Sequence, residues 1–365
     1  MVTQDYYDLF IHKLLLKNFF IVKYLSRGAS GIVWLAYDLK KNNYVAIKSS
    51  NFDTFDDVKK EYEIYKSLKQ HINISYLVKI FQAFEYTIDN ESFYCIVMEL
   101  YQFSLYDIIL YSKINKLSDD FLFYIIKKII LILHNLHIHN IIYCDLKPEN
   151  FLLKSSSNNL KTPMTLHELK KLPIDNINFS DSDSTDDSDT PLSIDSVVSN
   201  STSFIININD ITDIVISDFE SCVHIDNIKK YPDIFTCYYI PPELILGLTF
   251  DTSFDIWSFG CVLYELITGN ILFDTSDYRT HLHLISHKLQ SNFPSDLLNL
   301  SNKKDMYFLY DSNILKPIFD TINTPSLIDE LSSLQINTKF ITILLSCLKI
   351  NKNDRISSKE ILSLL

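Results

Sequence analysis

Hydrophobic and polar positions alternate with a period of two between residues 20 and 48. The runs IVKYL, GIVWLAYD and NNYVAIK place β-branched and aromatic side chains at alternating positions, and turn-like residues separate the runs. This alternation is typical of half-buried strands, so the beginning of the chain is predicted to form a sheet. The apolar run FYCIVMEL over residues 93–100 predicts a further, buried strand.

Helical spacing appears first over residues 56–70. The apolar positions that share one face of this predicted helix are Val58, Tyr62, Tyr65 and Leu68. A second helix, amphipathic at its start and apolar towards its end, is predicted over residues 117–140 with Ser118 as its N-cap. Helical patterns then dominate residues 255–365. The chain therefore reads as a strand-rich part followed by a helical part.

A polar segment interrupts this pattern between Ser155 and about Asp213. It is rich in Ser, Asn, Asp and Thr, and its stretch SDSDSTDDSDT (180–190) consists of acidic and hydroxyl residues alone. Such a composition offers too little apolar surface to offset the entropy of ordering, so this stretch is predicted to be disordered and solvated. Apolar order resumes with DIVISDF at residues 213–219.

Composition and charge exclude several classes of protein. The 365 residues are 47% hydrophobic and 21% charged, as in a globular protein, and the net charge of −12 argues against direct nucleic-acid binding. The most apolar stretch, residues 121–142, carries two lysines and three histidines, so no membrane span is expected, and residues 1–8 lack the basic start of a secretory signal. Six scattered cysteines without a CxxC pair predict reduced thiols in the cytoplasm or nucleus.

The first candidate for chemistry is LSRGASGIV (25–33), a loop between two predicted strands. Gly28 and Gly31 would let backbone N–H groups approach phosphate oxygens without a Cβ clash. The next strand ends at Lys48, which could reach the α- and β-phosphates if Glu61 of the following helix held it. Taken alone, this pair could also be a surface lysine near a helix glutamate.

The second candidate, YCDLKPEN (143–150), decides the interpretation. Asp145 can accept or steer the proton of an attacking hydroxyl, Lys147 can neutralise a transferring phosphoryl group, and Asn150 can supply an oxygen ligand to Mg²⁺. These residue types occur in this order directly after a long predicted helix and before the apolar run FLL, which is a specific signal.

Further along, Asp218 in ISDFES would hold Mg²⁺ at the β- and γ-phosphates. The segment TCYYIPPE (236–243) resembles one that shapes a substrate platform, and DIWSFGC (255–261) resembles a helix that anchors a catalytic loop. Arg355 in NKNDR is predicted to be the buried partner of Glu243, a pairing that its position near the end of the chain and the presence of only three arginines both favour.

In this order, and over nearly the whole chain, these motifs resemble the eukaryotic protein kinase fold. The resemblance implies an α+β, two-lobed structure with a β-rich N-lobe, a mostly helical C-lobe and ATP bound between them. The implied parts are an N-terminal extension (1–19), the N-lobe (20–101), the first part of the C-lobe (102–154), the acidic spacer (155–212) and the second part of the C-lobe (213–365).

The resemblance also assigns the site. It implies a gatekeeper at Met98, with the backbone of the hinge residues Glu99 and Tyr101 binding adenine. The residues assigned to ATP are Leu25, Gly28, Gly31, Val33, Ala46, Lys48, Glu61, Met98, Glu99, Tyr101 and Leu152; those assigned to catalysis are Asp145 and Lys147; those assigned to Mg²⁺ are Asn150 and Asp218. The apolar members of the ATP set could equally be ordinary core.

Lys147 and Thr236 fit the serine/threonine pattern rather than the tyrosine-kinase one. ELILG (243–247) and the extra segment between Leu272 and about Pro325 are similar to the CMGC branch, which includes cyclin-dependent, dual-specificity tyrosine-regulated, LAMMER and SR-protein kinases. VWLAYD, the helix at 278–294 and the spacing of 68 positions from Asn150 to Asp218 resemble the SR-protein kinases most. The hinge MELYQFSLYDII instead resembles the dual-specificity group.

Four positions depart from the kinase pattern, of which Ser26, in place of the first loop glycine, is a common and mild change. Cys144 replaces the arginine that docks a phosphorylated activation loop, so activity without loop phosphorylation is expected. Glu220 replaces the glycine after Asp218 and Phe219, where it could oppose ATP or face solvent, and Ile240 replaces an arginine. A pseudokinase scaffold that transfers nothing is the alternative that these changes leave open.

The expected partner is a protein substrate, a basic Arg/Ser-rich one if the SR-protein kinase resemblance holds, with no direct nucleic acid and no membrane. A dual-specificity-regulated, LAMMER or Pro-directed enzyme would follow another substrate rule. For the spacer, a localisation tether and an insertion without a role remain equal alternatives. Nothing in the sequence suggests more than a monomer.

Overall fold

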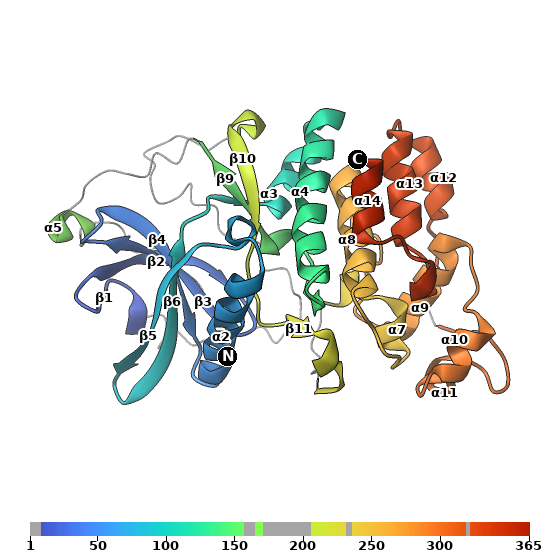
Figure 1. Ribbon diagram of the computed structural model, residues 1–365, viewed down its shortest axis with the longest axis horizontal. Helices are drawn as coiled ribbons and strands as arrows, with labels where there is room; N and C mark the ends of the chain where they lie inside the picture. Colours follow the sequence, from blue (N-terminus) through green and yellow to red (C-terminus); the bar gives the residue numbers. More distant parts are fainter. Residues whose placement is uncertain (1–8, 157–164, 171–205, 231–235, 319–321) are drawn as a thin grey trace. The chain divides into compact units, whose positions relative to one another are not determined.

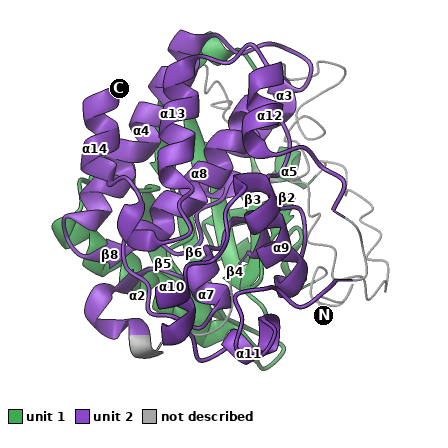
Figure 2. Cartoon of the chain, turned by 90° about the vertical axis from the view of Figure 1, so that its right-hand side faces the viewer, with its two compact units in different colours: residues 1–103, 152–220 green, residues 104–151, 221–365 purple. Residues whose placement is uncertain are grey.

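The computed structural model describes residues 9–156, 165–170, 206–230, 236–318 and 322–365 (Figure 1). The chain divides into two compact units, residues 1–103 with 152–220 and residues 104–151 with 221–365 (Figure 2). Each unit thus contains two separate stretches of the chain, and each is described by itself below.

The first unit is built on an antiparallel six-stranded sheet in the order β1-β2-β3-β4-β6-β5. Its strands are β1 (Leu14–Leu15), β2 (Phe19–Arg27), β3 (Gly31–Asp38), β4 (Asn43–Ser50), β5 (Ile80–Ile88) and β6 (Glu91–Glu99). Its other elements are α2 (Phe55–His71), the 3-10 turns η1 (Ile74–Tyr76) and η3 (Ile208–Asp210), the short helix α5 (Leu166–Leu169) and the paired strands β9 (Phe151–Ser155) and β10 (Ile211–Ile216). The strands predicted from the alternating runs are therefore present.

The period of two in β3 gives the sheet two apolar faces. Trp34 and Ala36 point into one core, with Ile47 and Phe93. Leu35 and its alternate neighbours Val33 and Tyr37 belong to a second cluster on the opposite face. The buried Trp34 indole donates a hydrogen bond to Ser49 Oγ at 2.8 Å, so its polar atom is satisfied within the core.

Residues 9–19, expected as an extension outside the lobe, take part in this unit. Phe10 is fully buried and its ring stacks on Trp34 with centroids 5.4 Å apart. Leu15 is also fully buried, and β1 pairs with β2. The segment is too short for its periodicity to be recognised, which is why the sequence did not predict a strand here.

The helix α2 has the predicted buried face, with Val58, Tyr65 and Leu68 buried and Tyr62 half-buried. Glu61 is buried on the same face. A buried carboxylate is costly unless it is paired, so this position points to a partner within the unit.

The second unit is mostly helical. Its longer helices are α3 (Leu105–Ser112), α4 (Asp119–His137), α8 (Ser253–Thr268), α9 (Tyr278–Leu289) and α13 (Thr338–Cys347). Its shorter helices are α7 (Pro242–Ile245), α10 (Ser295–Leu300), α11 (Lys304–Tyr307), α12 (Leu327–Ser333) and α14 (Ser358–Leu364). It also contains the 3-10 turns η2 (Pro148–Asn150), η4 (Ile225–Lys230), η5 (Cys237–Tyr239) and η6 (Lys352–Asp354) and the paired strands β8 (Ile141–Ile142) and β11 (Val223–His224). The strand β7 (Phe103–Ser104) lies at the division between the units.

The helix α8 forms the centre of this unit, since every residue from Phe254 to Leu266 is buried. It packs against α13 and α3, and α14 packs against α4 (Figure 1). The predicted N-cap of α4 is present, because the Ser118 hydroxyl accepts from the N–H of Phe121 at 3.3 Å. The α+β class expected from the sequence, with a β-rich part and a helical part, is confirmed.

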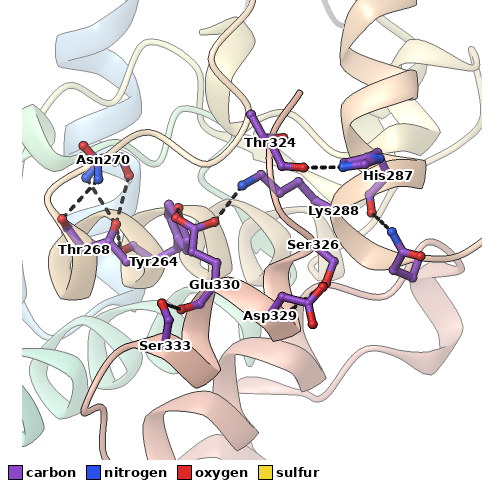
Figure 3. A network of polar contacts seen from close by, with 11 residues as sticks. Tyr264, Thr268, Asn270, His287, Lys288, Thr324, Ser326, Asp329, Glu330 and Ser333 are labelled. Atoms are coloured by element: carbon purple, nitrogen blue, oxygen red, sulfur yellow. Dashed lines mark hydrogen bonds and ion pairs between the residues drawn. The ribbon is translucent and has the colours of Figure 1, made fainter. Parts of the chain in front are cut away.

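A polar network ties α12 to α8 and α9 (Figure 3). Glu330 of α12 accepts from Lys288 Nζ of α9 at 2.7 Å and from the hydroxyl of Tyr264 of α8. The carbonyl of Thr324 lies 2.5 Å from Nε2 of His287. The extra segment that the sequence placed between Leu272 and Pro325 is thus joined to the helical core by charged groups.

The acidic run at 180–190 lies outside the described residues. Within the spacer range, residues 155–156, 165–170 and 206–212 are described. They include η3, the start of β10 and α5, in which Leu169 is fully buried. Among the described residues, no helix has both the length and the apolar character needed to cross a bilayer.

Candidate active site

The glycine loop joins β2 to β3 in the first unit. The N–H of Gly28 donates to the carbonyl of Gly31 at 2.8 Å, which closes the turn. A Cβ on Gly31 would lie 2.2 Å from the carbonyl oxygen of Ser49, whereas a Cβ on Gly28 would meet nothing closer than 4.0 Å. Gly31 is therefore required by the close approach of β4, and Gly28 is not required on steric grounds.

Lys48 and Glu61 form a buried ion pair. Lys48 Nζ lies 2.6 Å from Glu61 Oε2 and 3.5 Å from Asp218 Oδ1, and the side chains of Lys48 and Glu61 are 10% and 4% exposed. Burial alone would lower the pKa of Lys48, but the charges of Asp218, Glu61 and Glu220 outweigh burial and raise it. Lys48 is thus held as a cation, as the sequence predicted.

The segment that begins with Asp218 is also fixed within the first unit. Asp218 has a left-handed backbone with φ of 54°, and the fully buried Phe219 packs on Tyr65 of α2 with ring centroids 5.7 Å apart. The charge of Glu220 also acts on Lys48. Among the described residues no group of three or more His, Cys, Asp or Glu side chains could hold a metal ion, so Mg²⁺ bound by Asp218 would need phosphate oxygens and water as further ligands.

The apolar residues assigned to adenine largely come together. Leu25 and Ala46 belong to one buried cluster, and Val33 and Met98 pack against it. Leu152 is half-buried on β9 and is not a member of that cluster. Burial of these side chains fits ordinary core packing as well as a nucleotide pocket.

One backbone N–H group of the hinge is already hydrogen-bonded within the protein. The N–H of Glu99 donates to the carbonyl of Lys79 at 2.9 Å, so an adenine contact by Glu99 would have to use its carbonyl oxygen. The Tyr101 hydroxyl donates to Glu99 Oε2 at 3.0 Å and accepts from the N–H of Lys79 at 3.3 Å. Both side chains are therefore held by each other, and Tyr101 is also held by the backbone at Lys79.

In the second unit, Asp145 is held by three side chains. Asn150 Nδ2 donates to the Asp145 carbonyl at 2.9 Å and to Oδ2 at 3.1 Å, Lys147 Nζ lies 3.0 Å from Oδ2, and the Thr236 hydroxyl donates to Oδ1 at 2.8 Å. These contacts fix the carboxylate in one orientation. They also turn the amide oxygen of Asn150 away from Asp145, as a metal ligand there would need.

The loop that carries Asp145 is fastened to α8 by Asp255, which has no exposed surface. Its carboxylate accepts from the N–H groups of Tyr143 and Cys144, each at 2.9 Å, and lies 2.9 Å from Nε2 of His137. The sequence predicted that this helix anchors the loop. It did not predict His137, whose contact joins residues 118 positions apart and leaves no local signal.

Glu243 and Arg355 form the predicted pair. The guanidinium donates from Nη1 to Oε1 and from Nη2 to Oε2, each at 2.6 Å, with side-chain exposures of 1% and 0% for Glu243 and Arg355. Arg355 also lies over the ring of Trp257 at 4.9 Å. Planar bidentate pairing of this kind requires arginine, and the weak sequence argument from arginine scarcity is confirmed.

Two further acidic residues of the second unit were not predicted as functional. Burial raises the pKa of Glu149, and its Oε2 is buried without a hydrogen-bond partner among the described residues. Burial, reinforced by the charge of Glu149, raises the pKa of Glu265 to about 7, although the Tyr239 hydroxyl donates to Glu265 Oε2 at 2.8 Å. These two residues are 116 positions apart, so only the fold relates them.

Comparison with protein families gives one clear result. Residues 19–163 and 204–364 match the protein kinase domain. The chain belongs to the protein kinase family. The enzyme class expected from the sequence is confirmed at the level of this family.

Proteins similar to this chain indicate a branch within the protein kinase family. The chain is 27% identical to the probable serine/threonine-protein kinase clkA of Dictyostelium discoideum over 91% of the chain and 32% of that protein. It is 28% identical to dual specificity tyrosine-phosphorylation-regulated kinase 3 of Rattus norvegicus over 79% of the chain and 40% of that protein, and 28% identical to the probable serine/threonine-protein kinase dyrk2 of D. discoideum over 94% and 32%. These relatives lie in the expected CMGC branch of kinases, and the chain spans about a third to two-fifths of their length.

Proposed function

We propose that this kinase domain transfers the γ-phosphoryl group of ATP to serine or threonine hydroxyls of proteins. The observation that carries the proposal is the fixed Asp145 carboxylate, with Lys147 and Thr236 both in contact with it. A base must lie within hydrogen-bond reach of the proton it accepts and in a defined orientation, and this arrangement supplies that orientation.

Each of the predicted site residues then has a role. The substrate oxygen forms a bond to the γ-phosphorus as the bond to the β-bridging oxygen breaks, and the proton of the hydroxyl passes to Asp145. Lys147 offsets charge on the transferred group, and the buried cation Lys48 binds the non-transferred phosphates. Asp218 and Asn150 would hold Mg²⁺, which neutralises phosphate charge when bound.

We propose further that the preferred substrates are basic and Arg/Ser-rich, which would place the enzyme in RNA processing. Support comes from Glu149, four residues after Asp145, whose buried Oε2 has no hydrogen-bond partner among the described residues. The charge of Glu149 raises the pKa of Glu265. A guanidinium beside these carboxylates would offset their repulsion and donate to the unsatisfied oxygen. The net charge of −12 would also favour a basic substrate.

Two alternatives make different use of the same fold. A dual-specificity-regulated, LAMMER-type or Pro-directed kinase is supported by the names of the relatives and would phosphorylate another sequence pattern. A scaffold without transfer is supported by Glu220, whose charge acts on Lys48, and by the buried Ile240.

Cys144 supports activity without loop phosphorylation. In place of an arginine that would bind a phosphate, its side chain packs in an apolar cluster with Val223 and Phe254, and β11 pairs with β8 next to it. This packing would hold the start of the activation segment without a phosphate. The scattered spacing of the six cysteines, without a CxxC pair, supports a reducing compartment, cytoplasm or nucleus, and we propose a monomer there.

The test is phosphate transfer from Mg-ATP to an Arg-Ser repeat peptide and to a Ser-Pro peptide, with Asp145→Ala as the blank. Preference for the Arg-Ser peptide supports the full proposal, and Glu149→Gln should then reduce kcat/KM for that peptide by roughly tenfold or more. Transfer to the Ser-Pro peptide alone would assign a sister group. Transfer by the Asp145→Ala protein would refute the role of Asp145, and no transfer by the parent protein would favour the scaffold.

A further inference from the structure

The short helix α5 lies inside the acidic spacer, yet it packs on the first unit. Leu169 has no exposed surface, and α5 contacts β2 (Figure 1). One helical turn is not stable by itself in water, so tertiary packing must supply what holds this turn in place. The buried side chain of Leu169 is the contact that does so.

The sequence around Leu169 favours this turn once it is docked. The Thr165 hydroxyl and N–H both donate to Glu168 Oε2 at 2.7 Å, and the N–H of Glu168 donates back to Thr165 Oγ1 at 3.3 Å. The N–H of Leu169 donates to the Thr165 carbonyl at 3.0 Å. This reciprocal capping gives hydrogen-bond partners to the N–H groups of Thr165 and Glu168 and so stabilises the helical turn that carries Leu169.

Leu169 enters the apolar cluster on one particular face of the sheet. The buried members of this cluster are Phe20, Val22, Leu25, Leu35, Tyr37, Ala46, Leu100 and Leu169. Because side chains alternate along a strand, Ala46 and Lys48 of β4 point to the same face. The helix α5 therefore covers part of the face that carries the side chains assigned to ATP.

We propose that α5 is an intramolecular docking element: Leu169 anchors the spacer to the Lys48 face of the sheet and supports the nucleotide-binding side chains there. The proposal rests on the proposed ATP site. When α5 is docked, Leu169 completes the buried cluster that also contains Leu25 and Ala46. When α5 is released, that face loses a fully buried leucine, and the nucleotide binds a less ordered surface.

The test compares Leu169→Ser, Leu169→Met and His167→Ala in the full chain. His167 lies on α5 and is exposed, so its variant is the matched control, while methionine keeps an apolar anchor of similar size. The readouts are hydrogen exchange of the β2 and β3 amides without nucleotide, and the dissociation constant for Mg-ADP.

We expect Leu169→Ser to speed exchange in β2 and to weaken Mg-ADP binding by roughly threefold or more, with both effects absent in the other two variants. Unchanged exchange in Leu169→Ser would overturn the docking. Faster exchange with equal or tighter nucleotide binding would overturn the supporting role. If the parent protein binds no nucleotide, the proposed function fails, and the exchange data still decide whether α5 docks.

Discussion

The buried histidine in the first turn of α9 should make the domain sensitive to acid. His281 has no exposed surface, and neither ring nitrogen has a hydrogen-bond partner among the described residues. Its ring packs on Phe273 with centroids 5.2 Å apart. Burial lowers the pKa of His281 from 6.5 to about 3, so the folded protein keeps it neutral over most of the accessible pH range.

The sign and size of the effect follow from linkage. Between about pH 6.5 and pH 3 the unfolded chain binds a proton at His281 that the folded chain does not, so the free energy of unfolding falls as the pH falls. From pH 8 to pH 5 the loss is about 2 kcal/mol, because the unfolded imidazole is mostly protonated at pH 5. Replacing His281 with leucine removes this loss.

The assay is urea unfolding of the parent protein and of His281→Leu at pH 8, 7, 6 and 5. The difference in the free energy of unfolding is taken from the shift of the midpoint urea concentration. The variant should be at least as stable at pH 8, since two unsatisfied nitrogens leave the core, and its advantage should grow by about 2 kcal/mol at pH 5. His283→Leu, on the same helix, controls for helix propensity. An advantage of His281→Leu that does not change with pH would refute the reasoning.

Three further predictions follow from the described contacts. Arg355→Met should lower the free energy of unfolding by about 3–5 kcal/mol because Glu243 stays buried without its partner, and Glu243→Met added to it should recover part of the loss; equal melting temperatures for parent and Arg355→Met would contradict this. Gly31→Ala should weaken nucleotide binding because the added Cβ meets the Ser49 carbonyl at 2.2 Å, while Gly28→Ala, with nothing nearer than 4.0 Å, should bind nearly as the parent does. Phosphatase treatment should leave the peptide transfer rate unchanged, given the apolar packing of Cys144; a rate that falls with treatment would show that a phosphate is required.

The spacing of apolar residues over a few neighbouring positions was enough to predict most strands of the sheet and the main helices. Alternation in GIVWLAYD predicted the strand β3, although not that both of its faces are buried, and three- and four-residue spacing predicted α2. The motif residues Lys48 and Asp145 were found because their chemistry is encoded in a few neighbouring positions. Such signals are local, so one sequence is sufficient to read them.

Contacts between distant residues could not be found in this way. His137 and Asp255, or Glu149 and Glu265, are ordinary side chains until the fold brings them to each other. Leu169 is one of several leucines in a polar segment, with Leu166 and Leu172 three positions to either side, and nothing in the sequence distinguishes a docked leucine from a solvated one. Phe10 and Leu15 were missed for a related reason, because a two-residue strand has no measurable period.

The pairing of Glu243 with Arg355 also constrains the order in which the protein can be completed during synthesis. The two residues are 112 positions apart, and both side chains are almost fully buried. At ribosomal rates of about 5–20 residues per second, Glu243 is made roughly 6 to 22 s before its arginine. Burial of the Glu243 carboxylate without its partner would be strongly destabilising. During that interval α7 and the segment before it therefore cannot pack in their final positions. The last part of the domain to be translated therefore completes the platform on which its substrate would lie, and a ribosome that stops before residue 355 leaves a nascent chain that cannot finish this region.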